Sequence, residues 1–163
     1  MSWPHGSSGR TYIRPTRETA QKGSGQSGTP NTVAALTSPI SVADSSTVEI
    51  NLPYTGQVNF EGPIGTGTLQ LDNSANFSGT VAGMIGQDTL DLRDIDFVAI
   101  QKAAFSGSET SGTLSVGDGV HTANIQLLGN YIAAAFTTAS DGHGGTFVET
   151  QLHPVATLSA SHA

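Results

Sequence analysis

Four aspartates lie within nine residues near the middle of the chain, at Asp88, Asp91, Asp94 and Asp96. Carboxylate oxygens are the hard ligands that Ca²⁺ prefers in proteins. In an unbroken strand Asp88, Asp94 and Asp96 would share one face and Asp91 would lie on the other, although a bend at residues 93–94 would change this division. The cluster therefore predicts either a calcium site or a solvated acidic edge.

A fifth candidate calcium ligand is Asp141, in the run Asp-Gly-His-Gly-Gly of residues 141–145. This run is similar to half of a calcium-binding nonapeptide repeat, in which successive turns supply the ligands. A single copy lacks the tandem partners, so a tight glycine turn is the competing interpretation. Asp118, between two glycines, is interpreted in the same way.

The chain carries no recognisable catalytic motif. It has no cysteine, no H-E-x-x-H and no G-x-S-x-G, and the histidines considered as candidates are His121, His143 and His153. Carboxylate pairs suitable for glycoside hydrolysis are present but unspecific. We therefore expect a domain that is not an enzyme, with no catalytic residues and with calcium as its one candidate cofactor.

The elements that would position these side chains are most visible in residues 67–92. Three pieces there alternate polar with apolar residues and are separated by turn-forming residues, at 68–71, 77–81 and 89–92. Large apolar residues recur every ten or eleven positions, at Ile50, Phe60, Leu71, Val81 and Leu92. This regular spacing predicts a chain built from short strands.

Further strands are expected at 48–52 and 145–149, with a hairpin between 112–116 and 120–127 across the turn that holds Asp118. Residues 88–97 are expected to form one bent or bulged strand. The sequence does not decide between strand and helix for 98–105, and the alanines of 131–136 indicate one helical turn.

Composition and charge limit the class of protein. In 163 residues there are 20 glycines and 36% hydrophobic residues, which is typical of one turn-rich β-domain. Four of the six basic residues precede residue 23, and from residue 32 two basic residues face twelve carboxylates. Such an acidic body would repel nucleic acid. We expect a disordered, basic Gly/Ser-rich arm at 1–31, a β-domain at 32–150 and a flexible tail at 151–163.

Two all-β architectures fit the spacing. One is a short β-solenoid of the parallel β-helix or β-roll kind, with the hairpin near residue 118 as an antiparallel cap. The other is an antiparallel β-sandwich, which also has strands every 8 to 12 residues. We favour the solenoid, in which each coil would need two or three of the short strands.

Three phrases of the sequence resemble repeat units of large secreted bacterial proteins: GTLQLDNSANFSGTVAGMIGQDTLDLRDI, SGTLSVGDGVHTANIQLLGNY and ASDGHGGT. The relatives are adhesin-like or RTX-type chains of rhizobia and related proteobacteria. The resemblance covers residues 42–148 and implies a β-rich repeat, placement outside the cell or on its surface, and type I secretion with an uncleaved C-terminal signal. The tandem G-G-x-G-x-D repeats of RTX chains are absent here.

The function expected from these observations is that of a non-catalytic extracellular structural or adhesive β-domain. Its partner would be a cell-surface glycan or a host or matrix protein, and no membrane-spanning segment is expected, because no run of about 18 apolar residues occurs. The N-terminus lacks the apolar centre of a secretory signal peptide, so export would use another signal or the chain is part of a longer one. The alternatives are a calcium-stiffened RTX-like segment and a carbohydrate-binding module. The latter would stack sugars on exposed aromatic rings; the candidates are Tyr54, Phe60, Phe105, Tyr131, Phe136 and Phe147.

Overall fold

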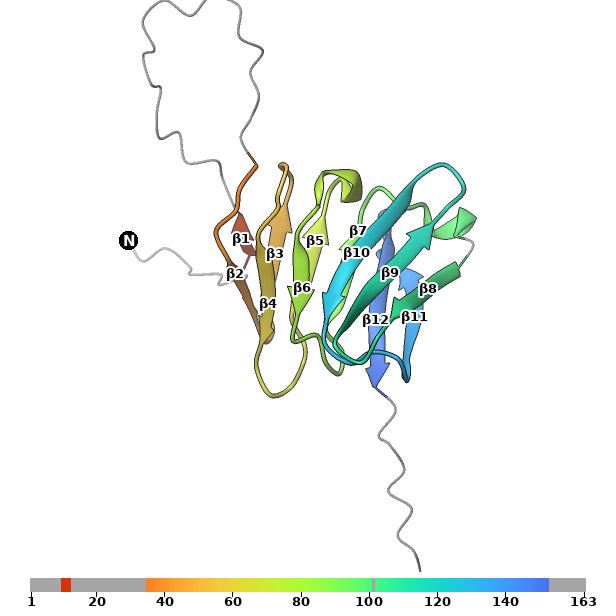
Figure 1. The fold of residues 1–163 in the computed structure, drawn as a ribbon. Coiled ribbons are helices and arrows are strands. Elements are labelled where there is room, and N and C mark those ends of the chain that lie inside the picture. The colour runs from red at the N-terminus through yellow and green to blue at the C-terminus, as the bar shows by residue number, and fades with distance from the viewer. Residues whose placement is uncertain (1–9, 13–34, 101, 153–163) are drawn as a thin grey trace, which may run out of the picture.

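The computed structural model describes residues 10–12, 35–100 and 102–152, and in these residues the chain is all-β. Two six-stranded mixed sheets lie one behind the other (Figure 1). Two single turns of 3₁₀-helix, η1 (Ser74–Asn76) and η2 (Phe97–Ala99), interrupt the strands. None of the described segments forms a helix with the length and apolar character needed to cross a membrane.

The first sheet is formed by six strands in the spatial order β1 (Arg10–Tyr12), β3 (Thr47–Ile50), β5 (Thr68–Leu71), β7 (Thr89–Leu92), β12 (Thr146–Leu152) and β11 (Ala134–Ser140). The first four strands are parallel to one another. β12 is antiparallel to β7, and β11 is antiparallel to β12. Both parallel and antiparallel pairing therefore occur in one sheet.

The second sheet repeats this arrangement with the order β2 (Ile40–Ala43), β4 (Gln57–Glu61), β6 (Thr80–Ala82), β10 (Thr122–Leu128), β9 (Ser111–Gly117) and β8 (Lys102–Gly107). The first four strands are again parallel. β9 is antiparallel to both of its neighbours. The predicted hairpin across Asp118 is confirmed as β9 and β10.

The ten-residue spacing of apolar residues has a simple structural cause. Ile50, Leu71 and Leu92 are paired neighbours in the first sheet, whereas Phe60 and Val81 belong to the second. The chain thus crosses between the sheets about every ten residues and returns to the same sheet 21 residues later. Side chains alternate across each strand, so every second residue enters a core shared by the two sheets.

Two stacked sheets agree with the sandwich alternative, but the pairing is not purely antiparallel. Between residues 40 and 92 every pairing of named strands is parallel, and antiparallel pairing is confined to the pairs that involve β8 to β12. Two parallel neighbouring strands require a crossover connection. Here each crossover contributes a strand to the other sheet before the chain returns.

Aromatic side chains fill the space at the β8–β11 end of the two sheets. The ring centroids of Phe105, Tyr131 and Phe136 lie 5.8 to 6.2 Å apart. Elsewhere Tyr54 stacks on Phe77, and its hydroxyl donates hydrogen bonds to the carbonyl groups of Ser38 and Gln57. These contacts stabilise the sheets where strand pairing ends.

Several local expectations differ from the structure. The bent strand predicted at residues 88–97 ends at Leu92, because the chain turns at 93–95 and enters η2. The segment 98–105, which the sequence did not resolve, divides between η2 and β8. The helical turn predicted at 131–136 is wrong, since β11 begins at Ala134.

The predicted domain limits can be compared only in part. Within the arm predicted at 1–31, Arg10–Tyr12 forms β1 and pairs with β3. β12 continues to Leu152, two residues past the predicted domain end. The rest of the arm, the first residues of the predicted domain and the tail from 153 onward lie outside the described residues.

Candidate functional site

Four aspartates in the turns bind backbone groups of the neighbouring turn in the stack; we call Asp44, Asp88, Asp94 and Asp118 the lacing aspartates. Asp44 accepts hydrogen bonds from the backbone N–H groups of Ile64 and Thr66, and Asp88 accepts one from Gly67 at 2.8 Å. Asp94 accepts two from Ser74, through its N–H and its hydroxyl. All of these bonds join residues that are 20 to 22 positions apart in the sequence. Equivalent positions in successive strands of one sheet have nearly the same separation, 21 residues.

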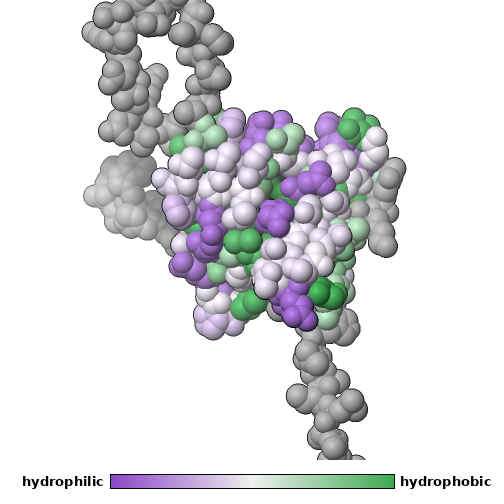
Figure 2. Space-filling view, viewed as in Figure 1, coloured by the Kyte–Doolittle hydropathy of each residue, from purple (hydrophilic) through white to green (hydrophobic). Residues whose placement is uncertain are grey.

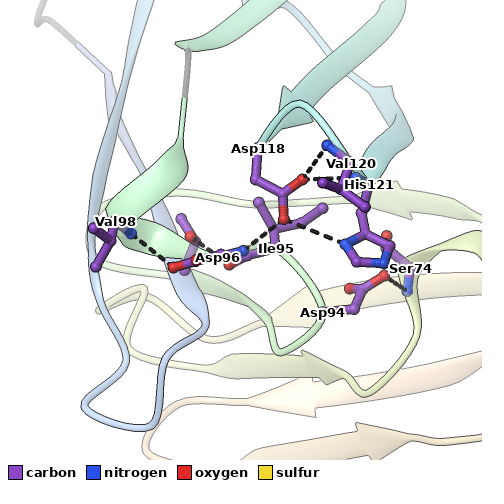
Figure 3. A network of polar contacts seen from close by, with 9 residues as sticks. Ser74, Asp94, Ile95, Asp96, Val98, Asp118, Val120 and His121 are labelled. Carbon is purple, nitrogen blue, oxygen red and sulfur yellow. Dashed lines mark hydrogen bonds and ion pairs between the residues drawn. The ribbon is translucent and has the colours of Figure 1, made fainter.

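Asp118 combines one bond to a neighbouring loop with bonds inside its own turn (Figure 3). One carboxylate oxygen accepts a hydrogen bond from the N–H of Asp96 at 2.9 Å, and the other accepts bonds from Val120 and His121. Hydrogen bonds from His121, Asp96 and Val120 hold the pKa of Asp118 well below its usual range. The carboxylate therefore joins the β9–β10 turn to the loop that follows β7.

These bonds decide how the five predicted calcium ligands are used. Asp88 lies before β7, whereas Asp94 and Asp96 follow it, so the strand separates them. Asp96 caps η2 by accepting from the N–H of Val98. Asp141 accepts from the N–H groups of His143 and Gly145 and closes a glycine turn, as the competing interpretation of that motif required.

The described residues contain no group of three or more Asp, Glu, His or Cys side chains placed to hold a metal ion. Ca²⁺ takes six to eight oxygen ligands. Of the five predicted ligands, Asp91 and Asp141 are brought to one place, and Arg93 lies between them. This arrangement does not fit a calcium site.

Asp91 and Asp141 line a hollow of about 190 Å³ on the outer face of the first sheet. We call it the first-sheet hollow; its lining residues are Thr47, Thr68, Gln70, Asp91, Arg93, Asp141, His143 and Phe147. Strand register places Gln70, Asp91 and Phe147 directly beside one another on β5, β7 and β12. The turn after β11 supplies Asp141 and His143, so residues far apart in the sequence form one site.

The charges in the first-sheet hollow are unusually placed. Arg93 Nη1 lies 3.9 Å from Asp91 Oδ2, and Arg93 Nε lies 3.5 Å from Asp141 Oδ2. Burial, and then the negative charge of Asp141, raise the pKa of Asp91 to about 6, while Arg93 offsets part of this. A carboxylate that titrates near neutral pH is common at binding and catalytic sites.

The two described histidines lie at different places, and no hydrogen bond or ion pair is found between either of them and Asp91 in the described residues. His143 lines the hollow, where its Nδ1 lies 3.1 Å from the backbone oxygen of Asp141. His121 Nδ1 lies 3.3 Å from Asp118 Oδ2, at the turn between β9 and β10. His153 lies outside the described residues.

Among the aromatic candidates for sugar stacking, Phe147 lines the hollow. Tyr54, Phe60 and Tyr131 are buried in the core. Phe105 and Phe136 are partly buried and pack against it.

Arg93 and Gln70 were not foreseen as site residues. Their positions depend on strand register. The sequence signal that could have identified Gln70 is its separation of 21 residues from Asp91, which is the repeat between paired positions of β5 and β7. Arg93 follows Asp91 by two residues, so side-chain alternation places it on the same outer face. Comparison of the chain with models of protein families, with curated proteins and with solved structures found no match in any of the three.

Proposed function

We propose that this chain is a non-catalytic structural or adhesive β-domain of a secreted or surface bacterial protein. The observation that supports this most directly is the use of its acidic side chains. The lacing aspartates bind backbone N–H groups of neighbouring turns, so their charge stabilises the stack. The extracellular setting and type I export rest on the resemblance of the sequence phrases.

Within this proposal, residues 40–92 form a short β-solenoid that the hairpins β9–β10 and β11–β12 cap. Thr47, Thr68 and Thr89 occupy equivalent positions in three successive parallel strands. In solenoids each repeat contacts mainly its neighbours, so stability is close to a sum over repeats. The hairpins would cover strand edges that otherwise favour aggregation.

A deletion series tests the solenoid. Removing residues 68–88 should leave a folded, less stable β-protein, because Thr89 then takes the position of Thr68. Removing residues 68–77 should abolish cooperative unfolding, because it moves residues of one sheet into the other. Far-UV circular dichroism and thermal melts measure the β-structure and the cooperativity of unfolding of each deletion variant. Equal loss of β-structure and of cooperative unfolding in the two variants would contradict the solenoid.

The outer face of the second sheet suits weak, distributed contacts. Small uncharged polar side chains bridge its strands there, as in the hydrogen bonds from Ser115 to Asn124 and from Thr113 to Gln126. On the face shown in Figure 2 the hydrophobic residues form separate spots. The exposed large apolar residues come from different segments: Ile64, Val98, Val120 and Ile132.

Adhesion is tested with beads that carry the purified chain. Attachment to glycan-coated or matrix-protein-coated surfaces above the level of bare beads is the expected result. The same preparation is assayed with chromogenic glycosides, esters and peptides at pH 5 to 8. Turnover of any of these by the purified chain would overturn the non-catalytic assignment.

A further inference from the structure

The first-sheet hollow contains carboxylate oxygens that lack hydrogen-bond donors. Asp91 is 5% exposed, and its Oδ1 has no partner, while Oδ2 of Asp141 has only the ion-pair contact with Arg93. Hydrogen bonds between nitrogen and oxygen usually span 2.7–3.2 Å, so the 3.5 and 3.9 Å separations to Arg93 are long. Buried acceptors are rarely left in this state, and a bound group that donates hydrogen bonds would satisfy them.

The charges of the hollow select the class of that group. Two carboxylates against one guanidinium disfavour an anion. A divalent cation would need more oxygen ligands and would lie within a few ångströms of the guanidinium of Arg93. Neutral hydroxyl groups satisfy the acceptors without adding charge.

We propose that the first-sheet hollow binds one ring of a neutral saccharide, with its hydroxyls donating to Asp91 and Asp141 and an apolar face of the ring against Phe147. Phe147 lies opposite Asp91 on the neighbouring strand, so one small ring can reach both. At about 190 Å³ the hollow has the volume of roughly six water molecules, below the usual range for drug-sized ligands. This inference deepens the proposed adhesive function and rests on it.

The other lining residues contribute further polar contacts. Thr47 and Thr68 supply hydroxyls from neighbouring strands, and Gln70 supplies an amide whose Nε2 donates to Asp72 at 2.9 Å. Arg93, held between the two carboxylates, offers donors to ring or hydroxyl oxygens. Acceptors, donors and an aromatic ring around a small volume are the features by which proteins bind sugars.

The test is ligand-observed NMR on the full chain with a panel of probes. The panel contains the methyl glycosides of glucose, galactose, mannose and N-acetylglucosamine, together with glucuronate as an acidic sugar and CaCl₂ as a cation. We expect binding of at least one neutral glycoside with a Kd on the order of 1 mM, and no binding of glucuronate or calcium. Asp91→Asn should weaken binding about tenfold, and Phe147→Leu, which keeps an apolar side chain, about fivefold.

Two exposed positions that do not line the hollow provide matched controls. Glu109→Gln removes a carboxylate, and Val98→Ala truncates an apolar side chain; both residues are exposed, and both variants should bind as the unchanged chain does. Circular dichroism and thermal melts confirm that each variant is folded. The site would be overturned if no neutral glycoside bound. It would also be overturned if Asp91→Asn and Phe147→Leu both bound the glycoside as tightly as the unchanged chain does. If the site fails but coated beads still attach to matrix protein, the proposed adhesive function stands without the site. If the beads attach to no surface, the adhesive function itself fails.

Discussion

Replacing Asp91 by asparagine should stabilise the domain at alkaline pH and have little effect at acidic pH. The folded-state pKa of Asp91 is raised from 3.8 to about 6, chiefly by burial and by Asp141. A raised carboxylate pKa means that the folded state holds the proton more tightly than the unfolded state does. The stabilisation from Asp91 is therefore complete below about pH 4 and is lost as the pH rises through about 6.

The size of the effect follows from the shift. A difference of about two pKa units corresponds to about 3 kcal/mol. Solvent reaches the open hollow and screens the charges, so we expect about half of this, or about 1.5 kcal/mol. Asparagine has nearly the same shape and does not titrate, so the variant keeps its stability above pH 6.

Urea unfolding followed by far-UV circular dichroism at pH 4 and pH 8 measures this difference. The free energy of unfolding of Asp91→Asn, minus that of the unchanged chain, should rise by about 1.5 kcal/mol between the two pH values. Glu109→Gln, at an exposed position, is the matched control and should show no such rise. An equal difference at both pH values for Asp91→Asn would refute the argument that burial in the hollow raises this pKa.

Three further substitutions test the core and the turns by thermal and urea unfolding. Leu90→Ala removes a fully buried side chain from the central strand β7 and should cost about 2–5 kcal/mol, whereas a loss below about 1 kcal/mol would contradict its place in a close-packed core. Asp118→Asn should lower the melting temperature at neutral pH, and because the folded-state pKa of Asp118 is depressed, the deficit should shrink as the pH falls into the strongly acidic range. Gly83→Ala should destabilise more than Gly142→Ala: both glycines have positive φ, at 76° and 80°, but a Cβ at Gly83 would lie 2.5 Å from the carbonyl oxygen of Phe60 and one at Gly142 would meet nothing within 4 Å. Equal losses at the two glycines would show that backbone strain alone, without the close contact, sets the cost.

The strands themselves were predictable where side-chain alternation is strict. Val48 and Ile50 in β3, and Leu90 and Leu92 in β7, alternate with polar residues, and each pair enters the core. The turn at Asp118 was predictable for the same kind of reason, because the neighbouring glycines and the flanking alternation are both local signals. Where local signals are weak, as in the alanines before β11, the pairing with β12 decides the conformation and overrides helix propensity.

The candidate site was foreseen only as separate pieces. Asp91, Asp141 and Phe147 were each singled out, for calcium binding or for sugar stacking, but nothing local indicated that they line one hollow. Their proximity follows from β12 pairing with β7, more than 50 residues away in the chain. The uses of Asp88 and Asp94 were likewise invisible, since their partners are backbone groups in the neighbouring turn.

Sequence alone determined the class of this protein: a glycine-rich, acidic chain of short strands whose apolar residues recur every ten or eleven positions. It could do so because alternation and turn chemistry act over a few residues. Tertiary structure alone decided that consecutive apolar residues of this series belong to different sheets. It also decided that the lacing aspartates bind neighbouring turns and that the buried carboxylate of Asp91 lies beside Arg93 and Phe147. Those outcomes depend on strand register, which is set by the packing of residues about 20 or more positions apart and leaves no mark on any short segment.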